Sequence, residues 1–201
     1  QKRQPLSLDQ IRTLQRHCYE KDDDVRWLVA LISDTGMRLA EAAGLMMKDL
    51  VLNSPHPHVV VTPYPNRSLK TKASERVIPL VGASLWAAQR LFDQNESVFC
   101  FPRYTNKQRC NSNSASAAIN KWVKSIAGED VVIHGLRHSF RDRLRAAEAP
   151  TELIDQLGGW SLKTVGQSYG NGYAIENLNS WMAKIVIRQG PLPPESTLMK
   201  T

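Results

Sequence analysis

The spacing of apolar residues changes within one stretch of this sequence, residues 50–80, and that change limits the folds open to the chain. Before and after the stretch, apolar residues recur at helical spacing. Inside it, residues 59–62 (VVVT) and 76–80 (RVIPL) are rich in β-branched side chains and are separated by proline and asparagine. Because 201 residues are enough to bury a substantial core, we predict one mainly α-helical domain, residues 1–187, with a small antiparallel β-sheet.

Start signals and apolar faces mark the individual helices. Ser7 and Gln10 form a capping-box pattern at the head of the first helix, whose apolar face carries Leu8, Ile11 and Leu14. The further helices are expected at residues 23–34, 39–45, 83–92, 114–126, 135–147, 151–157 and 175–187, and the proline-rich residues 188–201 are expected to form a mobile tail.

Composition narrows the class of protein. The net charge of +7 favours a polyanionic partner. Cys18, Cys100 and Cys110 lie far apart and form no cluster at zinc spacing, so we expect reduced thiols, a cytoplasmic location and no structural metal. No apolar run is long enough to span a bilayer, and the first residues do not resemble a signal peptide. A P-loop sequence is also absent, so we expect no cofactor.

Two isolated arginines, Arg38 and Arg137, are placed where each can bind a phosphate. Each is expected at the start of a helix, where backbone N–H groups also favour an anion. A guanidinium stays charged and offers a planar fork of donors, which suits the negative charge of a phosphate transition state. His134, one turn before Arg137, can donate to a phosphate oxygen or shuttle a proton. The alternative is a histidine that only caps the helix, and His138 fits that role better.

A tyrosine downstream can attack such a phosphate. Tyr169 follows the expected helix at 151–157, and Tyr173, four residues on, is a competing choice. A free phenol has a pKa near 10, so only about a thousandth is ionised at neutral pH. Neighbouring cations and a proton acceptor must therefore activate it, and Lys70 and Lys72, on the expected turn of the sheet, add two more cations. Together these residues predict metal-free cutting of a nucleic-acid backbone.

Four ordered segments resemble the sequence boxes of the tyrosine recombinase, or phage integrase, family. Residues 35–41 (TGMRLAE) are similar to the family's first arginine box, and residues 134–140 (HGLRHSF) to its H-x-L-R-H-T/S-F box. Residues 157–161 (LGGWS) match its L-G-H/W-S box, and Tyr169 falls nine residues after the tryptophan, where the family keeps its nucleophile. Residues 70–72 (KTK) resemble its β-hairpin lysine motif. The likeness spans about residues 6–173 and implies the DNA breaking-rejoining catalytic fold.

The resemblance also implies a role for each reacting residue. Arg38 and Arg137 would clamp the scissile phosphate, and Tyr169 would attack it. Lys70 would be the general acid for the leaving 5′-hydroxyl, with Lys72 as the alternative because the length of this turn varies among relatives.

Three further residues would support the reaction. His134 would accept a proton or donate to the phosphate, and Glu41 would act behind the arginines without reacting. Trp160 stands where many relatives have histidine. Its indole can donate a hydrogen bond and pack against neighbours but cannot carry a proton, so it would serve positioning.

The implied activity is site-specific DNA recombination through a 3′-phosphotyrosyl intermediate, for integration or excision of a mobile element. Two alternatives stay open: relaxation of supercoils, as in type IB topoisomerases, and a non-catalytic DNA-binding or regulatory module on the same scaffold. The implied partners are double-stranded DNA and a DNA-bending accessory protein. The implied location is the bacterial nucleoid, and the enzyme could also be encoded by a phage. The family's N-terminal DNA-clamping domain is not part of this sequence.

The last expected helix, residues 175–187, has an apolar face made by Leu178, Trp181, Met182 and Ile185. It follows a glycine-rich joint at residues 170–172. In the family such a helix docks on a neighbouring protomer, and docking on its own core is the alternative. We therefore expect a monomer in solution that forms a homotetramer on paired DNA sites.

Overall fold

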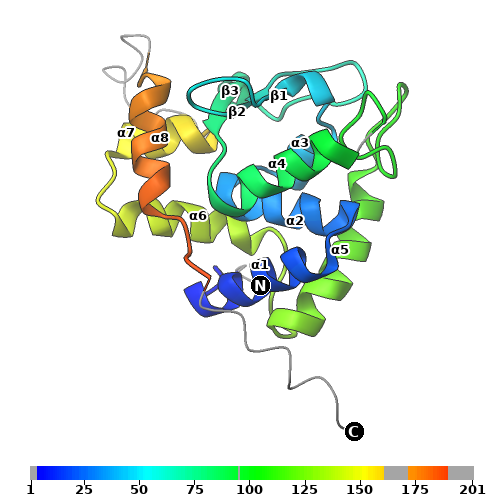
Figure 1. Ribbon diagram of the computed structural model, residues 1–201, viewed down its shortest axis with the longest axis horizontal. Helices are drawn as coiled ribbons and strands as arrows, with labels where there is room; N and C mark the ends of the chain where they lie inside the picture. Colours follow the sequence, from blue (N-terminus) through cyan, green and yellow to red (C-terminus); the bar gives the residue numbers. More distant parts are fainter. Residues whose placement is uncertain (1–3, 95, 161–171, 190–201) are drawn as a thin grey trace, which may run out of the picture.

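Helix α2 (Asp24–Thr35) runs through the middle of the structure, a computed structural model that describes residues 4–94, 96–160 and 172–189 (Figure 1). Around it pack α1 (Leu8–Lys21), α3 (Leu39–Ala43), α4 (Gly82–Gln94) and α6 (Gly135–Ala146). Residues 28–35 of α2 are all buried, as expected for a helix that neighbours cover on every side. The sequence prediction of a mainly helical domain is confirmed.

The helix starts predicted from the sequence are confirmed in detail at the first helix. The Ser7 side chain accepts a hydrogen bond from the Gln10 backbone N–H at 3.2 Å, and the Gln10 side chain accepts one from the Ser7 N–H at 2.9 Å. This reciprocal pair is the expected capping box, and it satisfies two backbone donors at the start of α1.

The β-rich stretch forms the expected small antiparallel sheet. Its strands are β1 (Leu50–Val51), β2 (His58–Val61) and β3 (Arg76–Pro79), in the order β1-β2-β3. Residues 62–75 connect β2 to β3 and include the short 3₁₀ helix η2 (Lys72–Ser74). We call this connection the lysine loop, because it carries Lys70 and the lysine that opens η2, as the sequence predicted.

Three helices end earlier than their sequence pattern suggested, and α6 does so by one residue, at Ala146. Helix α3 stops at Ala43 rather than residue 45, and a Cβ on the next residue, Gly44, would lie 2.3 Å from Cδ of Arg67. Helix α8 (Ile175–Lys184) stops three residues before the expected end.

The remaining helices follow the predicted pattern. A short 3₁₀ helix, which was not predicted from the sequence, precedes the sheet. These elements are α5 (Ser112–Ala127), α7 (Thr151–Gly158) and η1 (Met47–Asp49). No helix in the described ranges is both long and apolar enough to cross a membrane.

Helix α8 packs on its own chain. It contacts β3, and it buries Leu178 and Met182 together with Ile185, just after its last turn. The carbonyl of Ile185 accepts a hydrogen bond from the buried side chain of Arg143, which also pairs with Asp34 at 2.7 Å. The apolar face finds enough surface on its own core, as in the alternative stated above.

A cavity variant tests this packing. Met182 is fully buried, so Met182→Ala should lower the free energy of unfolding by about 2–5 kcal/mol. Leu8 was expected on the apolar face of the first helix with Ile11 and Leu14, but it is 54% exposed. It therefore supplies the control, since Leu8→Ala should stay within about 0.5 kcal/mol of the parent chain. Denaturant titration measures both values. Equal, small effects for the two variants would mean that α8 is not docked in solution.

Candidate functional site

Arg38 lies just past the end of the central helix. The chain leaves α2 through Gly36, whose φ of 63° and whose contact with the Phe140 ring both require glycine. Two residues later Arg38 caps the start of α3. Its Nη1 donates to Oε1 of Glu41 at 2.7 Å, and its backbone N–H donates to Oε2 at 2.9 Å. The guanidinium is therefore held in place while 24% of the side chain stays exposed.

Glu41 is buried between two guanidinium groups. Its second carboxylate oxygen accepts a hydrogen bond from Nη2 of Arg76, on β3, at 2.9 Å. Burial raises the pKa of this carboxyl, but the charges and hydrogen bonds of Arg76 and Arg38 outweigh burial, and the pKa of Glu41 lies below its ordinary value. The carboxylate therefore stays ionised at neutral pH and can hold both arginines.

Arg137, in the first turn of α6, is fixed by two carbonyl groups. Its Nη1 donates to the Gly36 carbonyl at 2.7 Å, and its Nη2 donates to the Gly158 carbonyl, at the end of α7, at 2.6 Å. Burial, with the charges of Arg38 and Arg76, lowers the pKa of Arg137 to about 9. The group therefore stays protonated at neutral pH, in a cluster that holds more positive than negative charge.

Trp160 covers this cluster from the end of α7. Gly159 has a φ of 62°, and the Trp160 N–H returns to the Asp155 carbonyl at 3.0 Å, the hydrogen bond of a Schellman turn. The turn places the indole ring 4.3 Å from the guanidinium carbon of Arg137 and 4.8 Å from that of Arg141. The expected positioning role is consistent with this stacking.

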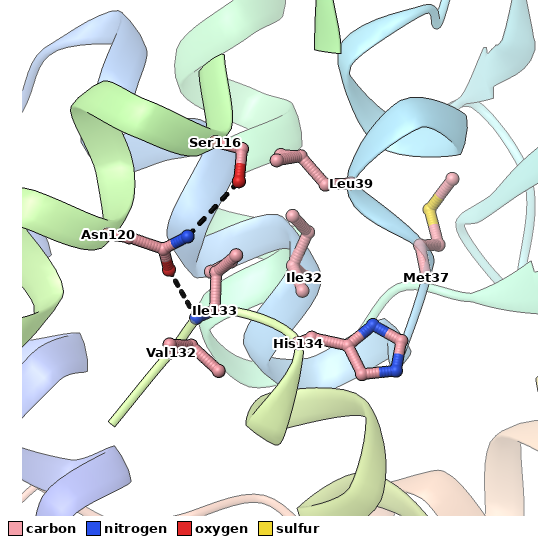
Figure 2. Close-up of a pocket in the computed structure, with 8 residues that line it drawn as sticks. All are labelled: Ile32, Met37, Leu39, Ser116, Asn120, Val132, Ile133 and His134. Atoms are coloured by element: carbon pink, nitrogen blue, oxygen red, sulfur yellow. Dashed lines mark hydrogen bonds between the residues drawn. The ribbon is translucent and has the colours of Figure 1, made fainter. Parts of the chain in front are cut away.

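His134 lines a cavity of about 200 Å³ (Figure 2). Met37, the neighbour of Arg38, lines the same cavity. Asn120 fixes the chain just before the histidine: its Oδ1 accepts the Ile133 N–H at 2.8 Å, and its Nδ2 donates to Ser116 at 3.1 Å. The imidazole also meets the ring of the exposed His138 edge-on at 5.2 Å.

The lysine loop is tied to Arg38. Nη1 of Arg38 donates to the Ser74 hydroxyl at 3.1 Å, and that hydroxyl lies 3.1 Å from the hydroxyl of Thr71. Lys70 and Lys72, on either side of Thr71, are both exposed. The structure therefore brings the loop to the cluster without distinguishing between the two lysines.

Tyr169, the expected nucleophile, lies outside the described residues. Its competitor Tyr173 is half-buried, and its backbone N–H and carbonyl both bond the side-chain amide of Gln156, at 2.8 and 3.0 Å. These bonds fix the chain at Tyr173 to α7.

Sequence reasoning missed Arg76, although a signal was present. In β3 its position is in phase with Ile78, and both side chains are buried. An arginine on the inward face of a strand needs a buried partner, and here the partner is Glu41. Among the described residues, no group of histidine, cysteine and acidic side chains could hold a metal ion.

A glycine variant tests the placement of Trp160. Helix propensity alone predicts that Gly158→Ala stabilises the chain by about 1 kcal/mol. A Cβ there would, however, lie 1.7 Å from Cζ3 of Trp160, so we expect a net loss of about 1–3 kcal/mol in thermal or denaturant unfolding. In the Trp160→Ala background the ring is gone, and the same glycine change should then stabilise. Stabilisation in both backgrounds would contradict the stacked arrangement.

Comparison with known proteins identifies relatives of this arrangement. The model of the Phage integrase family matches residues 4–174. The Tn1549 transposon integrase, in complex with circular intermediate DNA, is 18% identical with a TM-score of 0.57, and the match covers 90% of this chain and 65% of that one.

Two further solved structures share the fold. XerH site-specific recombinase bound to palindromic difH substrate is 18% identical with a TM-score of 0.57, and the match covers 81% of this chain and 48% of that one. XerA recombinase is 16% identical with a TM-score of 0.59, and the match covers 89% of this chain and 57% of that one. The chain thus spans less than two thirds of each of these structures. No curated protein sequence matches it. Since the family model covers most of its length, the chain belongs to the phage integrase family.

Proposed function

We propose that this chain is the catalytic part of a site-specific DNA recombinase, which cuts and rejoins DNA during integration or excision of a mobile element. The observation that carries the proposal is the joining of Arg38 and Arg137 in one cationic cluster, with Glu41 and backbone carbonyls holding them. Preorganised cations of this kind stabilise the charge of a phosphoryl-transfer transition state without reorganising during the reaction.

The proposed reaction has two reciprocal steps. In the first, the phenolic oxygen of Tyr169 attacks the scissile phosphorus, and the bond to the 5′-oxygen breaks as Lys70 or Lys72 gives that oxygen a proton. In the second, a 5′-hydroxyl of another strand attacks the 3′-phosphotyrosyl bond and releases the tyrosine. Because the phosphodiester bond is exchanged rather than hydrolysed, the two steps need no ATP.

The remaining residues have supporting roles in this proposal. His134 accepts the phenolic proton or donates to a phosphate oxygen, because it lies beside Met37 and one turn before Arg137. Trp160 holds Arg137 by stacking on its guanidinium.

Double-stranded DNA is the proposed partner. The solved structures of the Tn1549 integrase and XerH are complexes with circular intermediate DNA and with difH substrate, and the net charge of +7 of this chain favours a polyanion. We further propose a monomer in solution and a homotetramer on paired sites. Since α8 packs on its own core, assembly through that helix would require its release.

Replacing the nucleophile tests the proposal. With a nicked suicide substrate, Tyr169→Phe should abolish the covalent protein–DNA adduct and leave DNA affinity nearly unchanged, because affinity rests on phosphate contacts. Tyr173→Phe is the matched control and should retain the adduct. An adduct that survives in Tyr169→Phe, or is lost only in Tyr173→Phe, would overturn the assignment. Relaxation of supercoils without strand exchange would favour the topoisomerase alternative.

Chelation provides an independent test. The proposed cations are Arg38, Arg137 and a lysine of the lysine loop, so adduct formation should proceed at an unchanged rate in EDTA. The rate is followed by gel shift after denaturation, with and without added magnesium. Loss of cleavage in EDTA that magnesium restores would point to a metal-dependent nuclease.

A further inference from the structure

We propose that Arg76 is a positioning residue of this site, which sets the place of Arg38 and joins the lysine loop to the end of α7. The proposal rests on the function proposed above. Only 3% of the Arg76 side chain is exposed, so it acts through the groups that it holds rather than on the DNA.

Arg76 reaches three segments with three donors. Its Nη2 donates to Oε2 of Glu41 at 2.9 Å, its Nη1 to the Ser74 carbonyl at 2.6 Å, and its Nε to the Leu157 carbonyl at 2.8 Å. Each segment carries part of the site. Glu41 holds Arg38, the Ser74 hydroxyl contacts the same arginine, and the carbonyl after Leu157 belongs to Gly158, which holds Arg137.

The geometry requires a guanidinium. Its donors lie in a rigid plane and point in fixed directions, whereas an ammonium is a compact point charge at the end of a flexible stem. A lysine at this position could keep the ion pair with Glu41 but could not also reach the carbonyls of Ser74 and Leu157. Charge and shape therefore make separate contributions, which variants can separate.

Loss of Arg76 would change the charge state of Glu41. The charged groups around this carboxylate are Arg38 on its own helix, Arg76 from β3, Arg67 from the lysine loop and Arg137 from α6. Arginines stay protonated over the working pH range, so Glu41 is the group that titrates. Without Arg76, burial would raise the pKa of Glu41. Once protonated, the carboxyl would no longer pair with Arg38 as an ion.

The experiment measures single-turnover adduct formation on the suicide substrate as a function of pH. Arg76→Met should slow the reaction on the order of 100-fold, the scale for a displaced reacting group, with DNA affinity unchanged. The loss should grow as the pH falls, because Glu41 becomes neutral. Adding Glu41→Gln should remove this extra pH dependence. Arg76→Lys should restore the pH profile but not the full rate. Parallel pH profiles for the parent chain and Arg76→Met would overturn the proposal.

Thermal melting without DNA gives a readout that does not depend on activity. The pKa of Glu41 is lowered in the folded parent chain. The ionised carboxylate therefore stabilises the fold fully above the pKa of the unfolded chain, about 4.3. This stabilisation is lost as the pH falls through the pKa of the folded chain. In Arg76→Met the pKa of Glu41 in the folded chain should be higher than in the parent, because only Arg38 then opposes the effect of burial. The gap in melting temperature between the two should therefore narrow as the pH falls, since Glu41 is finally protonated in both.

The buried Leu91 of α4 supplies the control for simple destabilisation. Leu91→Ala should show a melting gap with no such pH dependence and an unshifted activity profile. If Arg76→Met does not fold, the pH profile of adduct formation and the pH dependence of the melting temperature are measured on Arg76→Lys and Glu41→Gln instead. Absence of an adduct from the parent chain would contradict the proposed function instead. The melting curves then decide the role of Arg76, and a gap that does not narrow overturns it.

Discussion

The buried carboxylate of Glu41, shared between Arg38 and Arg76, is the interaction on which the rest of the site depends. A buried charge is costly unless it is paired and hydrogen-bonded, and here each carboxylate oxygen has an arginine partner. The pairing fixes α3 against β3. Through the other donors of Arg76 it also fixes the lysine loop and the end of α7. One ion triad thus brings together residues from distant parts of the sequence.

The end of α2 connects this triad to the core. Asp34 pairs with Arg143, which also donates a hydrogen bond to the carbonyl of Ile185, just after α8. Two residues later the Gly36 carbonyl holds Arg137, and then the chain presents Arg38. A few consecutive residues at the C-terminal end of the central helix therefore anchor both the cationic cluster and the C-terminal helix.

Local signals in the sequence were enough for much of the fold. The capping residues, the helical periodicity and the β-rich run each act over a few residues, and the structure contains the elements that they predicted. The ends of α3 and α8 were misjudged because they depend on tertiary contacts, such as the Arg67 side chain against Gly44. The side on which α8 docks was open for the same reason, since an apolar face does not state what covers it.

Local sequence patterns likewise predicted some residues of the candidate site, whereas a residue that depends on distant contacts was missed. Arg38, Arg137 and His134 could be predicted as site residues because their spacing within short boxes is visible in the sequence. Glu41 was expected to act behind the arginines without reacting, and in the structure its carboxylate pairs with Arg38. Arg76 was missed because its three partners are distant in sequence or are backbone carbonyls. Sequence spacing gives no information about such contacts.

The most direct test of the account replaces one non-bridging oxygen of the scissile phosphate with a methyl group. If Arg38 and Arg137 neutralise charge on that phosphate, the uncharged linkage removes the need for one of them. Arg38→Ala should then lose on the order of 100-fold in cleavage rate on the ordinary substrate and much less on the methylphosphonate. An equal loss on both substrates would show that the cluster does not act on the charge of the scissile phosphate.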